Sequence, residues 1–381
     1  MSAFHKNALP CGEQLAEYQI ESVLGYGGFG ITYLATDTSL GANVAIKEYL
    51  PHDLASRDGQ TQIVPDLDAR DAVRDYHWGL KRFLQEAQAL AKFKHRNIVR
   101  VLRFMEANGT AYMVMEYEEG QSLGQYLRLH GNRLDESEML KIYLPILNGL
   151  QAVHEAGLLH LDIKPDNIYL REDGSPMLID FGSARQALSG HGSRTVLTPG
   201  YAPIEQYPDK GKQGPWTDVY AVGASLYRCI KGKRPTESLE RYQMILKIQT
   251  DPMTPASHIG KGKYQDRFLS CVEWAMQCFP TDRPQSARAL QDALIGKSSI
   301  TNKSSLAVNE ASVEKSGTKK RNTHKPWKTI KWLVVLSLLG GGAGAAYYYW
   351  PEIQQHWPQW RVQLEQWQEG AKRIIEYLSK D

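Results

Sequence analysis

The 381-residue sequence has few cysteines, and their spacing matches no disulfide framework or metal site. The four cysteines fall in no CxxC or Cys/His zinc spacing, and the 11 histidines form no HExxH motif. Their positions are Cys11, Cys229, Cys271 and Cys278. A disulfide framework and a structural metal are therefore both disfavoured, and we expect the main body of the chain to be cytosolic.

The sequence also lacks a large excess of charge of one sign. Lys and Arg number 45 against 42 Asp and Glu, which gives a formal net charge of +3. Proteins that bind nucleic acid usually carry a strongly basic surface, so we expect no nucleic-acid partner. Residues 1–10 contain no apolar run, which excludes a Sec signal peptide of ordinary form.

Long apolar runs are missing from residues 12–296, where strand-like segments alternate with amphipathic helices. Residues 297–331 differ because Ser, Thr, Asn and Lys dominate and little apolar surface is available for burial. This composition predicts a flexible linker. Its distal half, residues 315–331, contains Lys and Arg but no acidic residue.

One uncharged stretch follows the linker at residues 332–350. At about 1.5 Å per residue it would extend roughly 28 Å, close to the ~30 Å apolar thickness of a bilayer. Three consecutive glycines at 340–342 disfavour the alternative of a buried helix in water. We expect a single transmembrane helix in the inner cell membrane. Under the positive-inside rule, the basic linker and the main body face the cytoplasm.

Residues 351–381 are expected to form a short extracytoplasmic amphipathic helix, because apolar residues recur there at steps of three and four. The helix would either lie on the outer leaflet or associate with a second copy. Within the span, Gly340 and Gly344 form a GxxxG motif of the kind that lets two helices approach closely. A homodimer and a simple anchor are both compatible with this pattern.

A glycine-rich motif, Gly25-Tyr26-Gly27-Gly28-Phe29-Gly30, lies between two strand-like segments, 18–24 and 31–35. A dinucleotide-binding fingerprint would continue into a helix. A second strand instead predicts a hairpin whose backbone N–H groups can approach phosphate oxygens.

Further motifs follow in a fixed order. They are VAIK ending at Lys47, a helix carrying Glu86, HLDIKPDN at 160–167, IDFG at 179–182, APIE at 202–205, Asp218, and DRP at 282–284. In this order, over about residues 18–294, the sequence resembles the bacterial Hanks-type serine/threonine protein kinases, which are of eukaryotic type. The resemblance implies an α+β, bilobal protein-kinase fold with a β-rich N-lobe and a helical C-lobe, here followed by the transmembrane helix.

The expected domain plan follows from the resemblance and the composition. We predict an N-terminal lead at 1–17, a kinase domain at 18–296 with an insertion at about 50–78, a basic linker at 297–331, a transmembrane helix at 332–350 and a tail at 351–381.

The resemblance implies ATP and Mg2+ as cofactors. Lys47 would contact the α- and β-phosphates and be held by Glu86, Met115 would lie at the back of the adenine pocket, and Glu116 and Tyr117 would form the hinge. The full predicted nucleotide set is Leu24, Gly25, Gly27, Gly28, Gly30, Thr32, Ala45, Lys47, Glu86, Met115, Glu116 and Tyr117.

The same resemblance assigns the catalytic and metal-binding residues. Asp162 would accept or orient the proton of the substrate hydroxyl, and Lys164 would bind the γ-phosphate. Asn167 and Asp180 would supply oxygen ligands to Mg2+.

Other matches imply structural roles: Glu205 would pair with Arg283, and Asp218 would support the catalytic loop. His160 is expected to pack and to form hydrogen bonds. The sequence departs from the family pattern at Leu161, where many kinases have Arg, so the usual partner of an activation-loop phosphate is missing.

Lys164 and the TPGY segment at 198–201 favour Ser and Thr hydroxyls of protein substrates as acceptors. A pseudokinase that scaffolds partners is disfavoured by the complete catalytic set. A small-molecule kinase is disfavoured by the complete activation segment, and a receptor by the shortness of the tail.

Overall fold

The structure is a computed structural model that describes residues 6–59, 61–66, 71–181 and 197–298. The predicted transmembrane helix and tail lie outside the described residues, as does all but the start of the predicted linker. In the described ranges, no helix is long and apolar enough to cross a membrane.

An antiparallel sheet of six strands forms the N-terminal lobe, in the order β1-β2-β3-β4-β8-β7. Its strands are β1 (Gln14–Leu15), β2 (Tyr18–Gly27), β3 (Gly30–Asp37), β4 (Ala42–Tyr49), β7 (Val101–Ala107) and β8 (Thr110–Glu116). Ile31, Tyr33 and Ala35 of β3 are buried, while the residues between them are more exposed. This alternation is the period of two that one buried sheet face requires.

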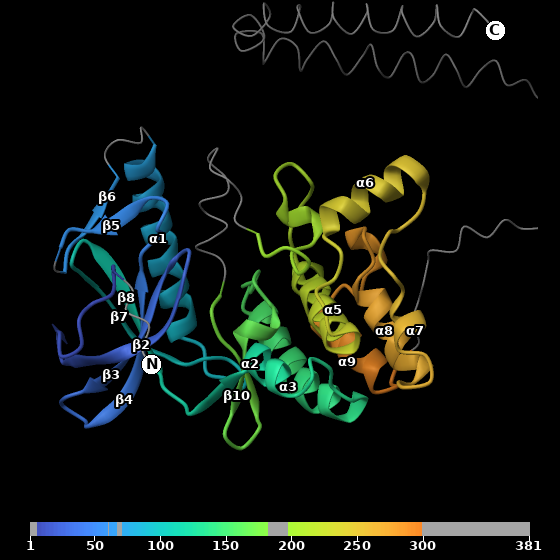
Figure 1. The fold of residues 1–381 in the computed structure, drawn as a ribbon, viewed down its shortest axis with the longest axis horizontal. Helices are drawn as coiled ribbons and strands as arrows, with labels where there is room; N and C mark the ends of the chain where they lie inside the picture. Colours follow the sequence, from blue (N-terminus) through green and yellow to red (C-terminus); the bar gives the residue numbers. More distant parts are fainter. Residues whose placement is uncertain (1–5, 60, 67–70, 182–196, 299–381) are drawn as a thin grey trace, which may run out of the picture. The chain divides into compact units, whose positions relative to one another are not determined.

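Helix α1 (Ala72–Ala91) packs against β7 and β8 (Figure 1). Its buried side chains, among them Tyr76, Phe83 and Leu90, recur at helical spacing. The helix therefore presents one apolar face to the sheet.

The predicted insertion contains a two-stranded hairpin, β5 (Ala55–Arg57) and β6 (Ile63–Pro65). The side chain of Arg57, at the end of β5, is buried and pairs with the fully buried Glu48 of β4, with Nη2 2.6 Å from Oε2. Tyr33 and Tyr112 donate hydroxyl hydrogen bonds of 2.7 and 2.8 Å to the same carboxylate. A buried carboxylate is tolerated here because its oxygens are paired and hydrogen-bonded.

The N-terminal lead contacts this hairpin as well as the sheet. Arg57 Nε donates a 2.8 Å hydrogen bond to the carbonyl of Asn7. Leu9 is buried, and its N–H donates to the Tyr33 hydroxyl at 3.0 Å. Arg57 of the insertion thus contacts both the N-terminal lead and β4 of the sheet.

The C-terminal lobe is mainly helical. Its elements are β9 (Gly120–Ser122), α2 (Leu123–Leu129), α3 (Glu136–Glu155), β10 (Ile168–Arg171), β11 (Pro176–Leu178), α5 (Pro215–Lys231), α6 (Ser238–Ile248), α7 (Ala256–Ile259), α8 (Asp266–Ala275) and α9 (Ala287–Leu294). Short 3-10 turns cover Pro165–Asn167, Ile204–Gln206 and Pro280–Asp282. Capping boxes at Ser122 and Asp135 begin α2 and α3 and satisfy N–H groups of their first turns.

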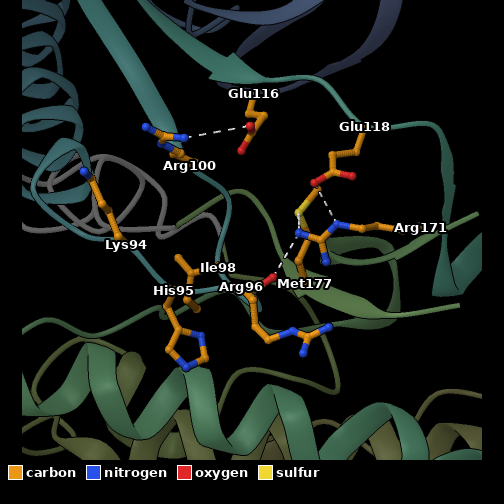
Figure 2. Close-up of a pocket in the computed structure, with 9 residues that line it drawn as sticks. All are labelled: Lys94, His95, Arg96, Ile98, Arg100, Glu116, Glu118, Arg171 and Met177. Carbon is orange, nitrogen blue, oxygen red and sulfur yellow. Dashed lines mark hydrogen bonds and ion pairs between the residues drawn. The ribbon is translucent and has the colours of Figure 1, made fainter. Parts of the chain in front are cut away.

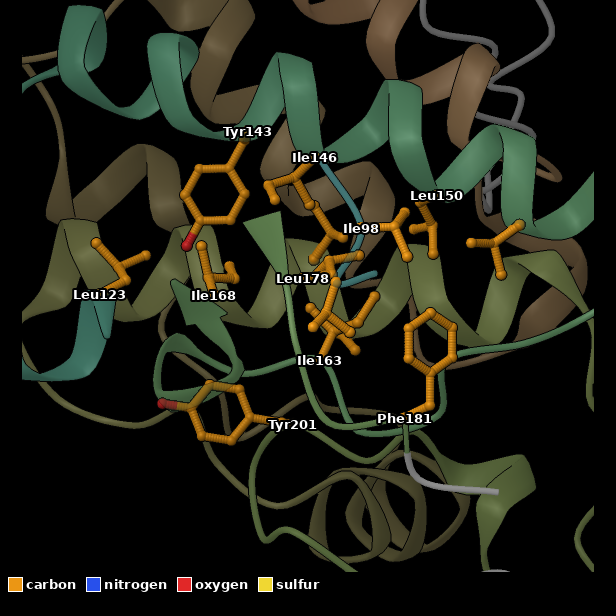
Figure 3. Close-up of a cluster of buried hydrophobic side chains, with 14 of the residues drawn as sticks. Ile98, Leu123, Tyr143, Ile146, Leu150, Ile163, Ile168, Leu178, Phe181 and Tyr201 are labelled. Atoms are coloured by element: carbon orange, nitrogen blue, oxygen red, sulfur yellow. The ribbon is translucent and has the colours of Figure 1, made fainter. Parts of the chain in front are cut away.

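The core of this lobe lies directly beneath the polar motifs. Figure 3 shows Tyr143, Ile146 and Leu150 of α3 pointing toward Ile163, which lies within the HLDIKPDN segment, and Leu178, which directly precedes the IDFG segment. Burial of these side chains anchors both segments on α3. The β-rich and helical lobes confirm the predicted α+β, bilobal fold.

Candidate active site

A cavity of about 400 Å3 lies where the two lobes meet. Its lining includes many of the predicted nucleotide residues: Leu24, Gly25, Thr32, Ala45, Met115, Glu116 and Tyr117, together with the predicted metal ligand Asp180. The remaining lining residues were not among the predicted site residues, although Asp166 and Ile179 lie in two of the motifs; they are Val99, Glu118, Gly120, Ser122, Gln125, Asp166, Tyr169, Met177 and Ile179. The structure therefore brings residues of the glycine-rich hairpin, the hinge and the IDFG segment around one space.

The glycines of the hairpin fall into two groups. A Cβ added at Gly25, Gly27 or Gly28 would meet no atom within 4 Å. A Cβ at Gly30 would lie 1.9 Å from the carbonyl oxygen of Glu48. Glycine is thus required at position 30 by the close approach of β3 to β4. This requirement is separate from the predicted contact with phosphate.

Lys47 and Asp180 meet near this cavity, although they are far apart in the sequence. Lys47 Nζ lies 2.9 Å from Asp180 Oδ1. Glu86 is buried on α1. The ion pair between Lys47 and Glu86, and the contact of Lys47 with phosphates, stay predictions.

The HLDIKPDN segment at 160–167 is named the catalytic loop here. Several polar groups contact its Asp162 carboxylate. Lys164 Nζ lies 3.0 Å from Oδ2, and Asn167 Nδ2 donates to Oδ2 at 2.9 Å and to the Asp162 carbonyl at 2.8 Å. The Thr198 hydroxyl donates a 2.6 Å hydrogen bond to Oδ1. This short contact shows that an aliphatic hydroxyl can reach Asp162 at the distance that general-base catalysis needs. Thr198 was not among the predicted site residues.

A fully buried carboxylate, Asp218 of α5, holds the backbone just before Asp162. Its Oδ2 accepts from the His160 N–H at 2.9 Å and lies 2.8 Å from His154 Nε2, and its Oδ1 accepts from the Leu161 N–H at 2.7 Å. These contacts agree with the predicted supporting role of Asp218.

Leu161 adopts a left-handed backbone conformation with φ +67°, which is unfavourable for a bulky side chain. Asp218 holds its N–H, and the buried Gln206 holds its carbonyl through Nε2 at 2.9 Å. Gln206 directly follows the APIE segment and lies in none of the motifs that the sequence contains. The end of that segment is therefore bonded to the residue before Asp162.

His160 is buried, and its hydrogen bonds define its tautomer. The Asp162 N–H donates to Nδ1 at 3.3 Å, so Nε2 carries the proton and donates to the Ile179 carbonyl at 3.1 Å. Burial lowers the pKa of His160 and keeps the ring neutral. The ring also lies against Phe181, with 4.4 Å between centroids. His160 therefore packs and orients, in line with the prediction.

Glu205 and Arg283 form the ion pair that the sequence led us to expect, and neither side chain is exposed. Arg283 Nη1 lies 2.7 Å from Glu205 Oε1, and Nη2 lies 3.2 Å from Oε2. Arg283 also donates to the carbonyls of Gln277 and Cys278, and Glu205 accepts from the Thr217 hydroxyl. This network fastens the APIE segment to the helical lobe.

Comparison with known proteins agrees with this geometry. The family model described as the protein kinase domain matches residues 18–295. Serine/threonine-protein kinase PknK of Mycobacterium tuberculosis is 32% identical over 276 residues, which cover 71% of this chain and 23% of PknK. The probable serine/threonine-protein kinase PknB of Corynebacterium glutamicum is 32% identical over 282 residues, which cover 71% of this chain and 40% of PknB. The chain therefore spans less than half the length of both relatives.

A solved structure, the apo form of PpkA-294, is similar in both sequence and fold. It shares 37% sequence identity with this chain, and the TM-score is 0.68. The similarity covers 76% of this chain and 99% of that structure.

Proposed function

Because the chain belongs to the protein kinase family, whose members use ATP and Mg2+, we propose that it transfers the γ-phosphate of ATP to Ser and Thr hydroxyls of proteins. One observation carries the proposal: the Thr198 hydroxyl already lies 2.6 Å from the Asp162 carboxylate. An acceptor hydroxyl in the same relation to Asp162 would be oriented and deprotonated as it attacks.

The neighbouring residues support this chemistry. Lys164 Nζ lies 3.0 Å from Asp162 Oδ2 and 3.4 Å from Thr198 Oγ1, so a cation is placed beside the acceptor oxygen. Lys164 would stabilise negative charge on the transferred phosphate, and Lys47 would do so on the phosphates that remain with the nucleotide.

Asn167 and Asp180 fit a magnesium site by their donor atoms. Asn167 commits its amide nitrogen to Asp162, which leaves Oδ1 as the atom available for a metal. Asp180 contributes a carboxylate, and both are the oxygen ligands that Mg2+ prefers. Bound Mg2+ supplies neutralisation of charge on the phosphate oxygens.

We test the activity by incubating the full chain in detergent with labelled ATP, Mg2+ and casein, followed by phosphoamino-acid analysis. Phosphoserine and phosphothreonine are expected, whereas the absence of label or phosphotyrosine alone overturns the proposal. Asp162→Asn should lower turnover by ~10²–10⁴-fold, the usual contribution of a general base, with little change in nucleotide affinity. Asp209→Asn, an exposed loop position, serves as the matched control.

Membrane anchoring is the second part of the proposal. We propose that residues 332–350 form a single span in the inner membrane, with the kinase domain cytoplasmic and the tail extracytoplasmic. The uncharged stretch and the basic flank support this arrangement. Alkaline phosphatase fused to the C-terminus should be active in cells, and activity of a cytoplasmic reporter at that end would show the opposite topology.

Pairing of two copies through Gly340 and Gly344 belongs to the same proposal. Gly340→Ile with Gly344→Ile should reduce cross-linking in membranes and phosphorylation of one copy by another. Unchanged cross-linking would identify the span as a simple anchor.

A further inference from the structure

A second cavity, of about 530 Å3, adjoins the hinge and has a basic lining (Figure 2). It shares Glu116, Glu118 and Met177 with the cavity assigned to ATP. The basic residues around it are Lys94, His95, Arg96, Arg100 and Arg171. No role in phosphoryl transfer accounts for this concentration of cations.

The arginines nearest the hinge face carboxylates of the hinge region, and one of the two is held firmly. Arg171 Nε lies 2.8 Å from Glu118 Oε1, and Arg171 Nη2 donates to the Arg96 carbonyl at 2.9 Å. Arg100 Nη1 lies 4.0 Å from Glu116 Oε1, a looser pair. Arg171 is therefore fixed in orientation, as an anion-binding guanidinium needs to be.

Two further cations have no such partner. Within the described part of the chain, neither the Lys94 ammonium nor the Arg96 guanidinium forms a hydrogen bond or ion pair through its side chain, and both residues are exposed. The four Lys and Arg side chains thus exceed the two hinge carboxylates. The excess positive charge in a hollow attracts anionic groups more strongly than charge on a flat surface does.

The basic lining continues into a neighbouring depression of about 550 Å3, which shares Arg96. Lys141 adds another cation there, and Leu144, Pro145 and Pro176 add apolar surface. We name the two depressions together the basic groove. Two depressions that meet at Arg96 suit an extended chain better than a single small anion.

We propose that the basic groove binds an acidic, extended segment of a protein substrate, an inference that rests on the proposed kinase function. Glu116, Glu118 and Asp173 lie among the cations and would repel an unbroken row of phosphates, whether from nucleic acid or from a membrane surface. A peptide avoids this repulsion because its acidic side chains are spaced and can alternate with apolar ones. Docking outside the ATP cavity would raise the local concentration of the acceptor hydroxyl without changing the chemical step.

Peptide binding is measured directly by fluorescence anisotropy on the full chain. The probe is a fluorescein-labelled 12-residue peptide in which Asp and Glu alternate with Leu and Val. The Lys94→Glu/Arg96→Glu variant should bind it at least 10-fold more weakly, and higher salt should weaken binding to the native chain. The control Lys261→Glu/Lys263→Glu makes the same change of charge at exposed positions outside the groove and should bind normally. All variants keep the basic linker, so its contribution to binding cancels.

Kinetics provide the second measurement. A Ser-containing substrate that carries the acidic segment should show a KM about 10-fold higher with Lys94→Glu/Arg96→Glu and an unchanged kcat. A substrate without the segment should be phosphorylated equally by all variants. Equal peptide affinity in both double variants overturns the proposal that the basic groove binds an acidic peptide. The same holds if an oligonucleotide or phosphatidylserine vesicles bind the groove more tightly than the peptide does. Groove-dependent peptide binding without any phosphorylation overturns the kinase proposal instead.

Discussion

The catalytic loop and the glycine-rich hairpin approach the same cavity but are built in opposite ways. In the loop, Asp218 is fully buried and engages three donors, and Asp162 is contacted by Lys164 and Asn167. In the hairpin, Leu24 and Tyr26 are 46% and 60% exposed.

This difference corresponds to what each region has to do. A group that takes a proton must be at the correct distance before the acceptor arrives, so its surroundings are fixed in advance. A region that admits and releases a nucleotide needs room and few contacts of its own. Substitutions in and around the two regions can show where the fixed region ends and how much of the activity depends on it.

Removal of Arg283 should give the largest loss of stability, because it leaves the Glu205 carboxylate buried and unpaired. We expect Arg283→Met to lower the free energy of unfolding by about 3–5 kcal/mol in urea denaturation. Glu205→Gln combined with Arg283→Met should recover much of this loss. A decrease of less than about 1 kcal/mol in the single variant would show that the pair does not anchor the APIE segment.

The two kinds of glycine in the hairpin should respond differently to alanine. Gly30→Ala places a methyl group against the Glu48 carbonyl and should cost about 1–3 kcal/mol in the free energy of unfolding. Gly27→Ala meets open space and should stay within about 0.5 kcal/mol of the native chain. Equal costs in thermal or urea unfolding would remove the distinction between a packed and an open end of the hairpin.

Gln206→Leu tests whether the hydrogen bond that holds the Leu161 carbonyl contributes to the rate of phosphoryl transfer. Loss of one hydrogen bond to the Leu161 carbonyl removes about 1 kcal/mol, which corresponds to a decrease in kcat of roughly 5-fold. The KM for ATP should not change, since Gln206 does not line the cavity between the lobes, where we propose that ATP binds. Gln265→Leu, at an exposed position, is the matched control. A change in KM alone would contradict a positioning role.

Acid should lower the free energy of unfolding because His160 is buried in its neutral form. Burial lowers the pKa of this ring, so below about pH 6.5 the unfolded chain binds a proton that the folded chain does not. This part of the stability is complete above about pH 6.5 and decreases as the pH falls from 6.5 to 5.5. His160→Asn should show a flatter dependence in urea denaturation at the two pH values, whereas the exposed His130→Asn should behave like the native chain.

The sequence was sufficient for the fold class and for much of the site, because the motifs are short and each carries its own geometry. Asp162, Lys164 and Asn167 lie within one eight-residue motif, so one turn of backbone brings them together. The order of the motifs then implied the two lobes and the pairing of Glu205 with Arg283.

Contacts between single residues outside motifs could not be predicted. Gln206 and Leu161 meet only because the APIE segment packs under the catalytic loop, and nothing in the identity of Gln206 indicates its partner. The same holds for Arg57, which lies in the insertion and whose partner is on β4. Such contacts depend on how distant segments pack in three dimensions, and hydrophobic periodicity carries no information about them.

The position of Glu48 directly after Lys47 has a consequence for how the sheet assembles. Neighbouring residues of a strand point to opposite faces, so a one-residue slip of β4 would move one of these two side chains into the other's place. A slip in one direction would bury Lys47 beside the Arg57 guanidinium, and a slip in the other would place Glu48 against Asp180. Either slip places like charges together. A misaligned sheet is therefore penalised in both directions, and this pair of adjacent opposite charges acts as a register check during folding.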